Sequence, residues 1–236
     1  MKNLTDPELD DLDYEEAKKY DKRTFFQYYW SYLKQNHLIF FTFLPNSDYN
    51  IIYAKIGLFI VSFGLFFTIN GFFFSDETMH KLYEDKGIFD IIFQIPQILY
   101  SSIVSSIIDY ILKNLSLSEN KILELKSEIT EQNLDFTSSQ TKANQIQKNL
   151  KIKLIIFFVL STLLMLFFWY FISCFCGVYI TTQIILINDT LMSFGSSLVF
   201  PFILSFISGC IRIPSLRSKR NLKFLYNINK LVNLLL

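Results

Sequence analysis

The sequence predicts an all-α membrane protein with four transmembrane helices. Four long apolar segments are the first reason, and they cover 51–74, 91–112, 154–177 and 191–211. Each is long enough to cross a hydrocarbon core of about 30 Å at about 1.5 Å per residue. Composition is the second reason, because 51% of the 236 residues are hydrophobic and 26 of them are Phe. The third reason is that Lys and Arg crowd alternate connecting segments.

The placement of the basic residues predicts the topology. The residues before the first run, the loop 113–153 and the C-terminal tail are rich in Lys and Arg, whereas the loop 178–190 holds none. The positive-inside rule therefore puts both termini and the long loop in the cytoplasm. The plasma membrane is the default location. The net charge of +1 speaks against a basic surface of the kind that binds nucleic acid.

The first 50 residues are predicted to be a cytoplasmic segment ahead of the 51–211 transmembrane domain. An acidic stretch at 5–16 overlaps a region, 14–33, in which apolar and aromatic residues recur at helical spacing with charges on the other face. This pattern predicts an N-terminal amphipathic helix. The pattern fits a helix that lies in the membrane interface or packs on a partner, and it fits equally well a soluble helix that covers the cytoplasmic loop.

Two further cytoplasmic elements are predicted. Apolar residues recur at helical spacing on both sides of a polar stretch in 113–153, which indicates a helical hairpin between the second and third transmembrane helices. The tail 212–236 starts with basic residues and continues with an apolar helical face, so it is predicted to be an amphipathic helix on the membrane. Its basic residues would face anionic lipids, each contributing about 1 kcal/mol. This lipid-facing basic patch consists of Arg212, Arg217, Lys219, Arg220 and Lys223.

A polar stripe runs along the second apolar segment. Polar side chains in hydrocarbon need partners or water, so this face is predicted to turn inward. One interpretation is packing between helices through hydrogen bonds. The other is a wetted path on which Asp109, near the inner mouth, attracts cations. The stripe consists of Gln94, Gln97, Ser101, Ser105 and Asp109.

The fourth segment carries a matching stripe of small residues, one every four positions. Small side chains allow the backbones of two helices to approach closely in a membrane. The sequence therefore predicts that the fourth helix packs through this stripe, and the preferred partner is the second helix. The stripe consists of Ser197, Pro201, Ser205 and Gly209.

Five segments of the chain carry a resemblance to known proteins. They are DYEEAKKYDKRTFFQYYWSYLK (13–34), FFSDETMHKLYEDKGIFDIIFQIPQILYSSIVSSII (73–108), LSLSENKILELK (115–126), FFWYFISCFCGVY (167–179) and ISGCIRIPSLRSKR (207–220). Through them the chain resembles a widespread family of multi-pass membrane proteins, or membrane regions, from ciliates and other protists. In that family this block often closes a much longer polypeptide, so the resemblance implies that the chain is the membrane-anchoring end of a larger protein or a standalone version of it. The family has no established activity or cofactor, and the resemblance implies no site residue.

The function that these patterns favour is a membrane anchor or assembly module that works as a homo-oligomer or within a larger membrane protein complex. The alternative is a subunit of an oligomeric cation channel lined by the second helix. An enzyme is the least supported class, because the sequence contains no phosphate-binding loop, no G-x-S-x-G and no HExxH motif. No metal site and no cofactor are expected.

Overall fold

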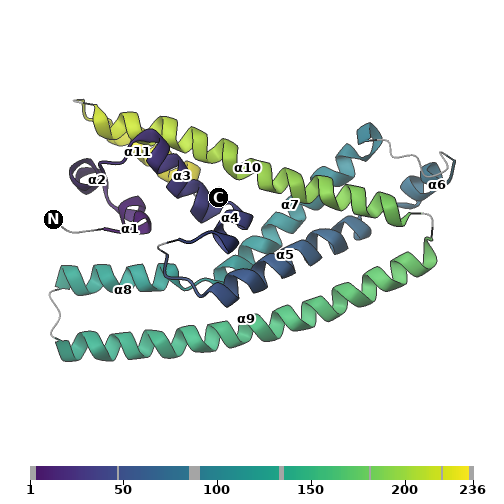
Figure 1. Ribbon diagram of the computed structural model, residues 1–236, viewed down its shortest axis with the longest axis horizontal. Coiled ribbons are helices and arrows are strands. Elements are labelled where there is room, and N and C mark those ends of the chain that lie inside the picture. Colours follow the sequence, from purple (N-terminus) through teal and green to yellow (C-terminus); the bar gives the residue numbers. More distant parts are fainter. Residues whose placement is uncertain are drawn as a thin grey trace. The chain divides into compact units, whose positions relative to one another are not determined.

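Helices are the only regular secondary structure in the described part of the chain. The computed structural model describes residues 4–46, 48–84, 91–132, 136–180, 182–218 and 220–233. These residues form eleven helices, and no strand occurs among them (Figure 1). The prediction of an all-α protein is confirmed.

Four of the helices are long and apolar enough to cross a membrane, as the sequence predicted. Two of them extend well beyond the predicted runs, because the residues that were assigned to loops on hydropathy continue the helix without a break. They are α5 (Ile52–Phe72), α7 (Ile91–Ser116), α9 (Phe136–Val178) and α10 (Gln183–Arg217).

The remaining helices are shorter. The stretch 14–33, expected to be one amphipathic helix, is divided between two of them. The division follows from Asp21, whose side chain accepts a hydrogen bond from the Arg23 backbone at 3.2 Å, and from Thr24, which starts a new helix through a capping box with Gln27. These helices are α1 (Asp6–Asp11), α2 (Tyr14–Tyr20), α3 (Phe25–Asn36), α4 (Leu38–Phe43), α6 (Asp76–Glu84), α8 (Glu119–Gln132) and α11 (Lys223–Asn233).

The chain forms two compact units, which we call the terminal unit and the bundle unit. The terminal unit comprises Met1–Asn50 and Leu198–Leu236, and the bundle unit comprises Ile51–Ser197. Helix α10 contributes its first part to the bundle unit and its remainder to the terminal unit.

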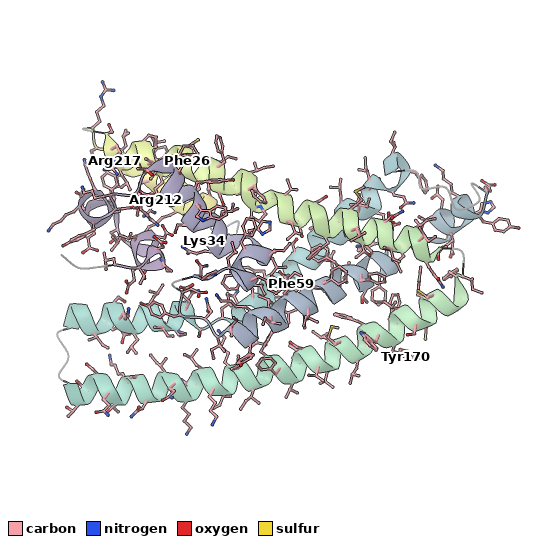
Figure 2. The ribbon with its side chains drawn as sticks, viewed as in Figure 1. Phe26, Lys34, Phe59, Tyr170, Arg212 and Arg217 are labelled. Atoms are coloured by element: carbon pink, nitrogen blue, oxygen red, sulfur yellow. The ribbon has the colours of Figure 1, made fainter. Side chains whose placement is uncertain are left out.

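In the bundle unit, α5 is the central helix and packs against both α7 and α9. Its buried leucines and valine share one apolar cluster with a leucine from α7 and two phenylalanines from α9. The outward faces of α7 and α9 expose many large apolar side chains, Tyr170 among them (Figure 2), which suits contact with lipid. The cluster consists of Leu58, Val61, Leu65, Leu112, Phe157 and Phe168.

Three glycines of α5 let α9 approach closely. They recur at intervals of seven residues, which keeps them on one face of the helix. A Cβ atom at Gly64 would lie 3.0 Å from Met165 Sδ, and one at Gly71 would lie 2.9 Å from the Phe171 ring. At Gly57 it would meet a ring of α9 at 3.4 Å. Because these three positions lack a side chain, the backbone of α5 can lie close to the side chains of α9.

Helix α8 lies alongside the first part of α9 (Figure 1). Lys142 Nζ is 2.9 Å from Glu128 Oε2, and Lys153 Nζ donates to the Leu117 carbonyl oxygen at 2.7 Å. The ion pair is well exposed, so it contributes little to the free energy of folding.

The terminal unit joins the two ends of the chain. Its core packs Tyr14 and Ala17 of α2 against Leu216 of α10 and Tyr226 of α11. The hydroxyl of Tyr226 donates to the Leu12 carbonyl oxygen at 2.7 Å. This core therefore holds the N-terminal helices to the last part of α10 and to α11.

Candidate functional site

A hydrogen-bonded network of polar side chains connects three apolar helices of the bundle unit. At its centre is Asn70 of α5, which is fully buried. Asn70 Nδ2 donates to Ser193 Oγ of α10 at 2.6 Å, and Asn70 Oδ1 accepts from Ser101 Oγ of α7 at 2.6 Å. One amide side chain thus links α5, α7 and α10 by bonds that hydrocarbon cannot supply.

A carboxyl group lies in the same part of the bundle, at the interface of α7 and α10. Asp189 of α10 has no exposed surface, and its neighbours on α7 are the buried amides of Gln94 and Gln97. Gln97 Nε2 donates to Asp189 Oδ2 at 2.9 Å. The amide of Gln94, with Nε2 turned toward the carboxyl group, donates to Oδ2 at 2.7 Å. The three side chains form what we call the Asp189 cluster.

The polar partners of Asp189 are neutral. None of the described residues places a positive charge against its carboxyl group. A buried carboxyl group with no cation beside it is costly to ionise. This separates the Asp189 cluster from an ordinary buried ion pair.

The rest of the predicted polar stripe on α7 also lies against protein. Ser101 and Ser105 are fully buried, and Asp109 is half-buried and accepts a hydrogen bond from Ser62 of α5. Ser105 Oγ has no hydrogen-bond partner among the described residues. The stripe as a whole therefore faces α5 and α10 within the bundle unit.

A second buried polar cluster lies in the terminal unit and centres on Arg212 of α10 (Figure 2). The sequence had placed Arg212 in the lipid-facing basic patch, which is wrong, because its side chain is completely enclosed. Its Nη2 lies 3.2 Å from Asp21 Oδ2 and donates to the Leu9 carbonyl oxygen at 2.7 Å. The guanidinium also stands over the rings of Tyr28 and Tyr226, at 5.3 and 5.1 Å from their centroids.

Asp21 also binds a second arginine. Arg23 Nε and Nη2 contact the two oxygens of Asp21 at 3.0 and 2.8 Å, and Nη2 also reaches Asp10 Oδ1 at 2.6 Å. Burial raises the pKa of the Asp21 carboxyl, but the hydrogen bonds and charge of Arg23, with the charge of Arg212, outweigh burial and hold that pKa below its ordinary value. Burial also raises the pKa of Tyr226 to about 12. Asp10, Asp21, Arg23 and Arg212 form what we call the arginine clamp.

The remaining members of the predicted basic patch have different surroundings. Arg217 Nη2 donates to the backbone carbonyl oxygens of Lys22 and Arg23, at 2.7 and 3.1 Å. Arg220 and Lys223 are exposed, and Lys219 lies outside the described residues.

The predicted small-residue stripe of α10 is divided between the two units. Ser197 is half-buried and donates to the Phe194 carbonyl oxygen at 2.7 Å. Pro201, Ser205 and Gly209 are buried in the terminal unit. A Cβ atom at Gly209 would lie 2.8 Å from the ring of Phe25, so the close neighbour of this glycine is α3, a partner that the sequence did not suggest.

Sequence reasoning missed Asp189 and Asn70. A signal for Asp189 was present, because the spacing of four residues that defines the small-residue stripe continues upstream through Ser193 to Asp189. Asn70 is a polar residue inside the first apolar run and belongs to no pattern of its own. Its partners could not be read from sequence, because they come from two other helices.

The described residues hold no group of three His, Cys, Asp or Glu side chains that could bind a metal ion. Comparisons of the chain with protein-family models, with curated proteins and with solved structures find no match.

Proposed function

We propose that the protein is a multi-pass membrane anchor that serves as an assembly module in a larger membrane complex or homo-oligomer. Four apolar helices provide the means of insertion, and their large exposed apolar faces are available to lipid or to other helices.

The observation that carries this proposal is the bonding of polar side chains within one chain. Asn70 bonds to Ser101 and to Ser193 and so joins three helices, and Ser62 donates to Asp109. A pore would instead need this face of α7 to be open to water. The mutual bonding therefore favours packing over conduction.

The orientation is part of the proposal. With both termini in the cytoplasm, α8 and the first part of α9 form a cytoplasmic hairpin that offers a docking surface. Helix α11 exposes Phe224 and Leu231, with Arg220 and Lys223 exposed nearby in the sequence. This pairing of apolar and basic side chains suits the surface of an anionic leaflet.

Accessibility of α7 to a water-soluble thiol reagent tests the proposal. In a protein whose native Cys174, Cys176 and Cys210 are replaced by Ser, a Cys is introduced at Ser101 or Ser105. We expect neither to react in nanodiscs, whereas a Cys at the exposed Tyr83 of α6 reacts readily. Rapid labelling at both α7 positions would overturn the anchor in favour of a pore.

Electrical recording is a second, independent test. Purified protein in planar bilayers should carry no cation current above that of empty bilayers. A current that disappears in Asp109→Ala would refute the anchor proposal. The mass of the particle in nanodiscs then identifies the assembly, because a monomer, a homo-oligomer and a complex with a second protein differ in mass.

A further inference from the structure

The Asp189 cluster has a property that anchoring does not require. Its carboxyl group is completely enclosed, and the side chains that bond to it in the described part of the chain are two amides from α7. A Leu or Ser at this position would pack two helices without the cost of burying an ionisable group. An ionisable group at such a position in a membrane protein is a sign of function.

The surroundings disfavour the ionised carboxylate. An uncompensated charge in a buried, apolar interior is so costly that such groups usually become neutral. Two amide N–H donors stabilise the charge in part, but no described cation stands against it. The neutral acid costs less, provided that an acceptor is available for its proton.

The amides supply that acceptor. The end of the Gln94 side chain faces both oxygens of the Asp189 carboxyl group. With Nε2 in that position, it donates to a carboxylate; with Oε1 there, after half a turn of the amide, it accepts a proton from the acid. Gln97 adds a second acceptor of the same kind, because its Oε1 is buried and has no hydrogen-bond partner in the described part of the chain.

We propose that Asp189 is a reversible proton-binding site inside the bundle unit, with Gln94 and Gln97 as the side chains that adapt to its two forms. The ligand is a single proton. When it binds, the carboxyl O–H donates to a glutamine carbonyl oxygen; when it leaves, the amides turn and donate N–H to the carboxylate. The link between α7 and α10 persists in both forms, but its donors and acceptors are exchanged.

The described side chains that bond to Asp189, and those next to them, do not titrate. Gln94 and Gln97 of α7 are neutral, and so is Asn70 of α5, which binds Ser193 one turn further along α10. The other acid of α7, Asp109, is bonded to Ser62. No described charged side chain acts on Asp189 appreciably. A proton exchange seen here would therefore belong to Asp189 itself.

Infrared spectroscopy of the full chain in nanodiscs tests the proposal. A protonated carboxyl group gives a C=O stretching band that is separate from carboxylate bands and shifts in D₂O. We expect the wild-type protein at neutral pH to show such a band that is missing in Asp189→Asn. Asp76→Asn, which alters an exposed acid of α6, serves as the matched control and should retain it.

Titration completes the test. The band should disappear on raising the pH and return on lowering it. Gln94→Leu removes a donor to the charged form, and bonds to a charged group are stronger than those to a neutral one. The proton affinity of Asp189 should therefore be about tenfold higher in Gln94→Leu than in the wild type. Asp189→Glu keeps the acid and moves the band, so the assignment does not depend on the folding of Asp189→Asn. If neutral pH shows only carboxylate bands for residue 189, or the band does not titrate, the proton site is refuted.

Discussion

Arg212 and Asp21 stand 191 positions apart in the sequence, yet their side chains meet at 3.2 Å with no exposed surface on either. Arg23 holds the other side of the same carboxyl group. Two short N-terminal helices are thereby tied to the last part of α10 by charge as well as by the apolar core around Tyr14 and Tyr226. A buried pair of this kind is costly to break from one side, because the remaining charge has no partner.

Removing one charge of the arginine clamp should therefore destabilise the terminal unit strongly. We expect Arg212→Ala to lower its free energy of unfolding by about 3–5 kcal/mol. Arg220→Ala, at an exposed position, should change it by less than about 0.5 kcal/mol. Thermal unfolding followed by the fluorescence of Trp30 measures both, in a protein whose Trp169 is replaced by Phe. Equal effects of the two variants would contradict the role of the clamp.

The junction of α3 and α4 should respond to pH. His37 is buried between the rings of Phe40 and Phe202, and burial lowers its pKa below the ordinary value of 6.5. At pH values between the lowered pKa of the folded protein and 6.5, the unfolded chain binds a proton at His37 that the folded chain does not. The folded state therefore loses stability as the pH falls through this range.

The measurement is the melting temperature of the terminal unit between about pH 7 and about pH 5. We expect a smaller decrease for His37→Phe than for the wild type. His80→Gln, at the exposed second histidine, should keep the wild-type decrease. If His37→Phe has an undiminished pH dependence, the titrating group lies elsewhere.

Filling the glycine face of α5 should weaken its packing on α9. A Cβ at Gly71 would come within 2.9 Å of Phe171, so Gly71→Ala should cost about 1–3 kcal/mol through overpacking. Gly195→Ala is the matched control, because nothing lies within 4 Å of the added atom, and it should gain up to about 1 kcal/mol from helix propensity. Reversible unfolding in mixed micelles gives both values. A cost at Gly195 as large as that at Gly71 would exclude packing as the cause.

The network at Asn70 should contribute measurable stability to the bundle unit. Asn70→Leu leaves two hydroxyl groups, those of Ser101 and Ser193, without their shared partner. Hydrogen bonds between membrane helices contribute about 0.6 kcal/mol each on average, so a loss of about 1–2 kcal/mol is expected. Ser196→Ala, which removes a bond within α10 only, should have a smaller effect in the same unfolding measurement.

The sequence predicted the elements better than their partners. Hydropathy and length identify a membrane helix without reference to its neighbours, and all four predicted spans have a counterpart in the structure. The extra length of α10 was missed because Gln183 and Asp189 count against a membrane span when each residue is weighed alone. Asp189 is accommodated through Gln97, and that pairing exists only after folding.

Arg212 is a charged residue whose surroundings could not be predicted from the sequence either. A base next to an apolar run is, on average, a solvated residue that marks the inner face of the membrane. Its burial depends on Asp21, and no periodicity links positions so far apart. The polar stripe of α7 was visible because its members share a helix face, whereas its partners Asn70 and Ser62 had no pattern of their own.

The length of α9 has a mechanical consequence. A helix of 43 residues is about 64 Å long, roughly twice the thickness of the hydrocarbon layer. An upright α9 would project its leading turns about 30 Å past the lipid tails as a stiff rod, braced by α8. A domain or partner attached near Lys142 would be held at a fixed distance from the bilayer surface.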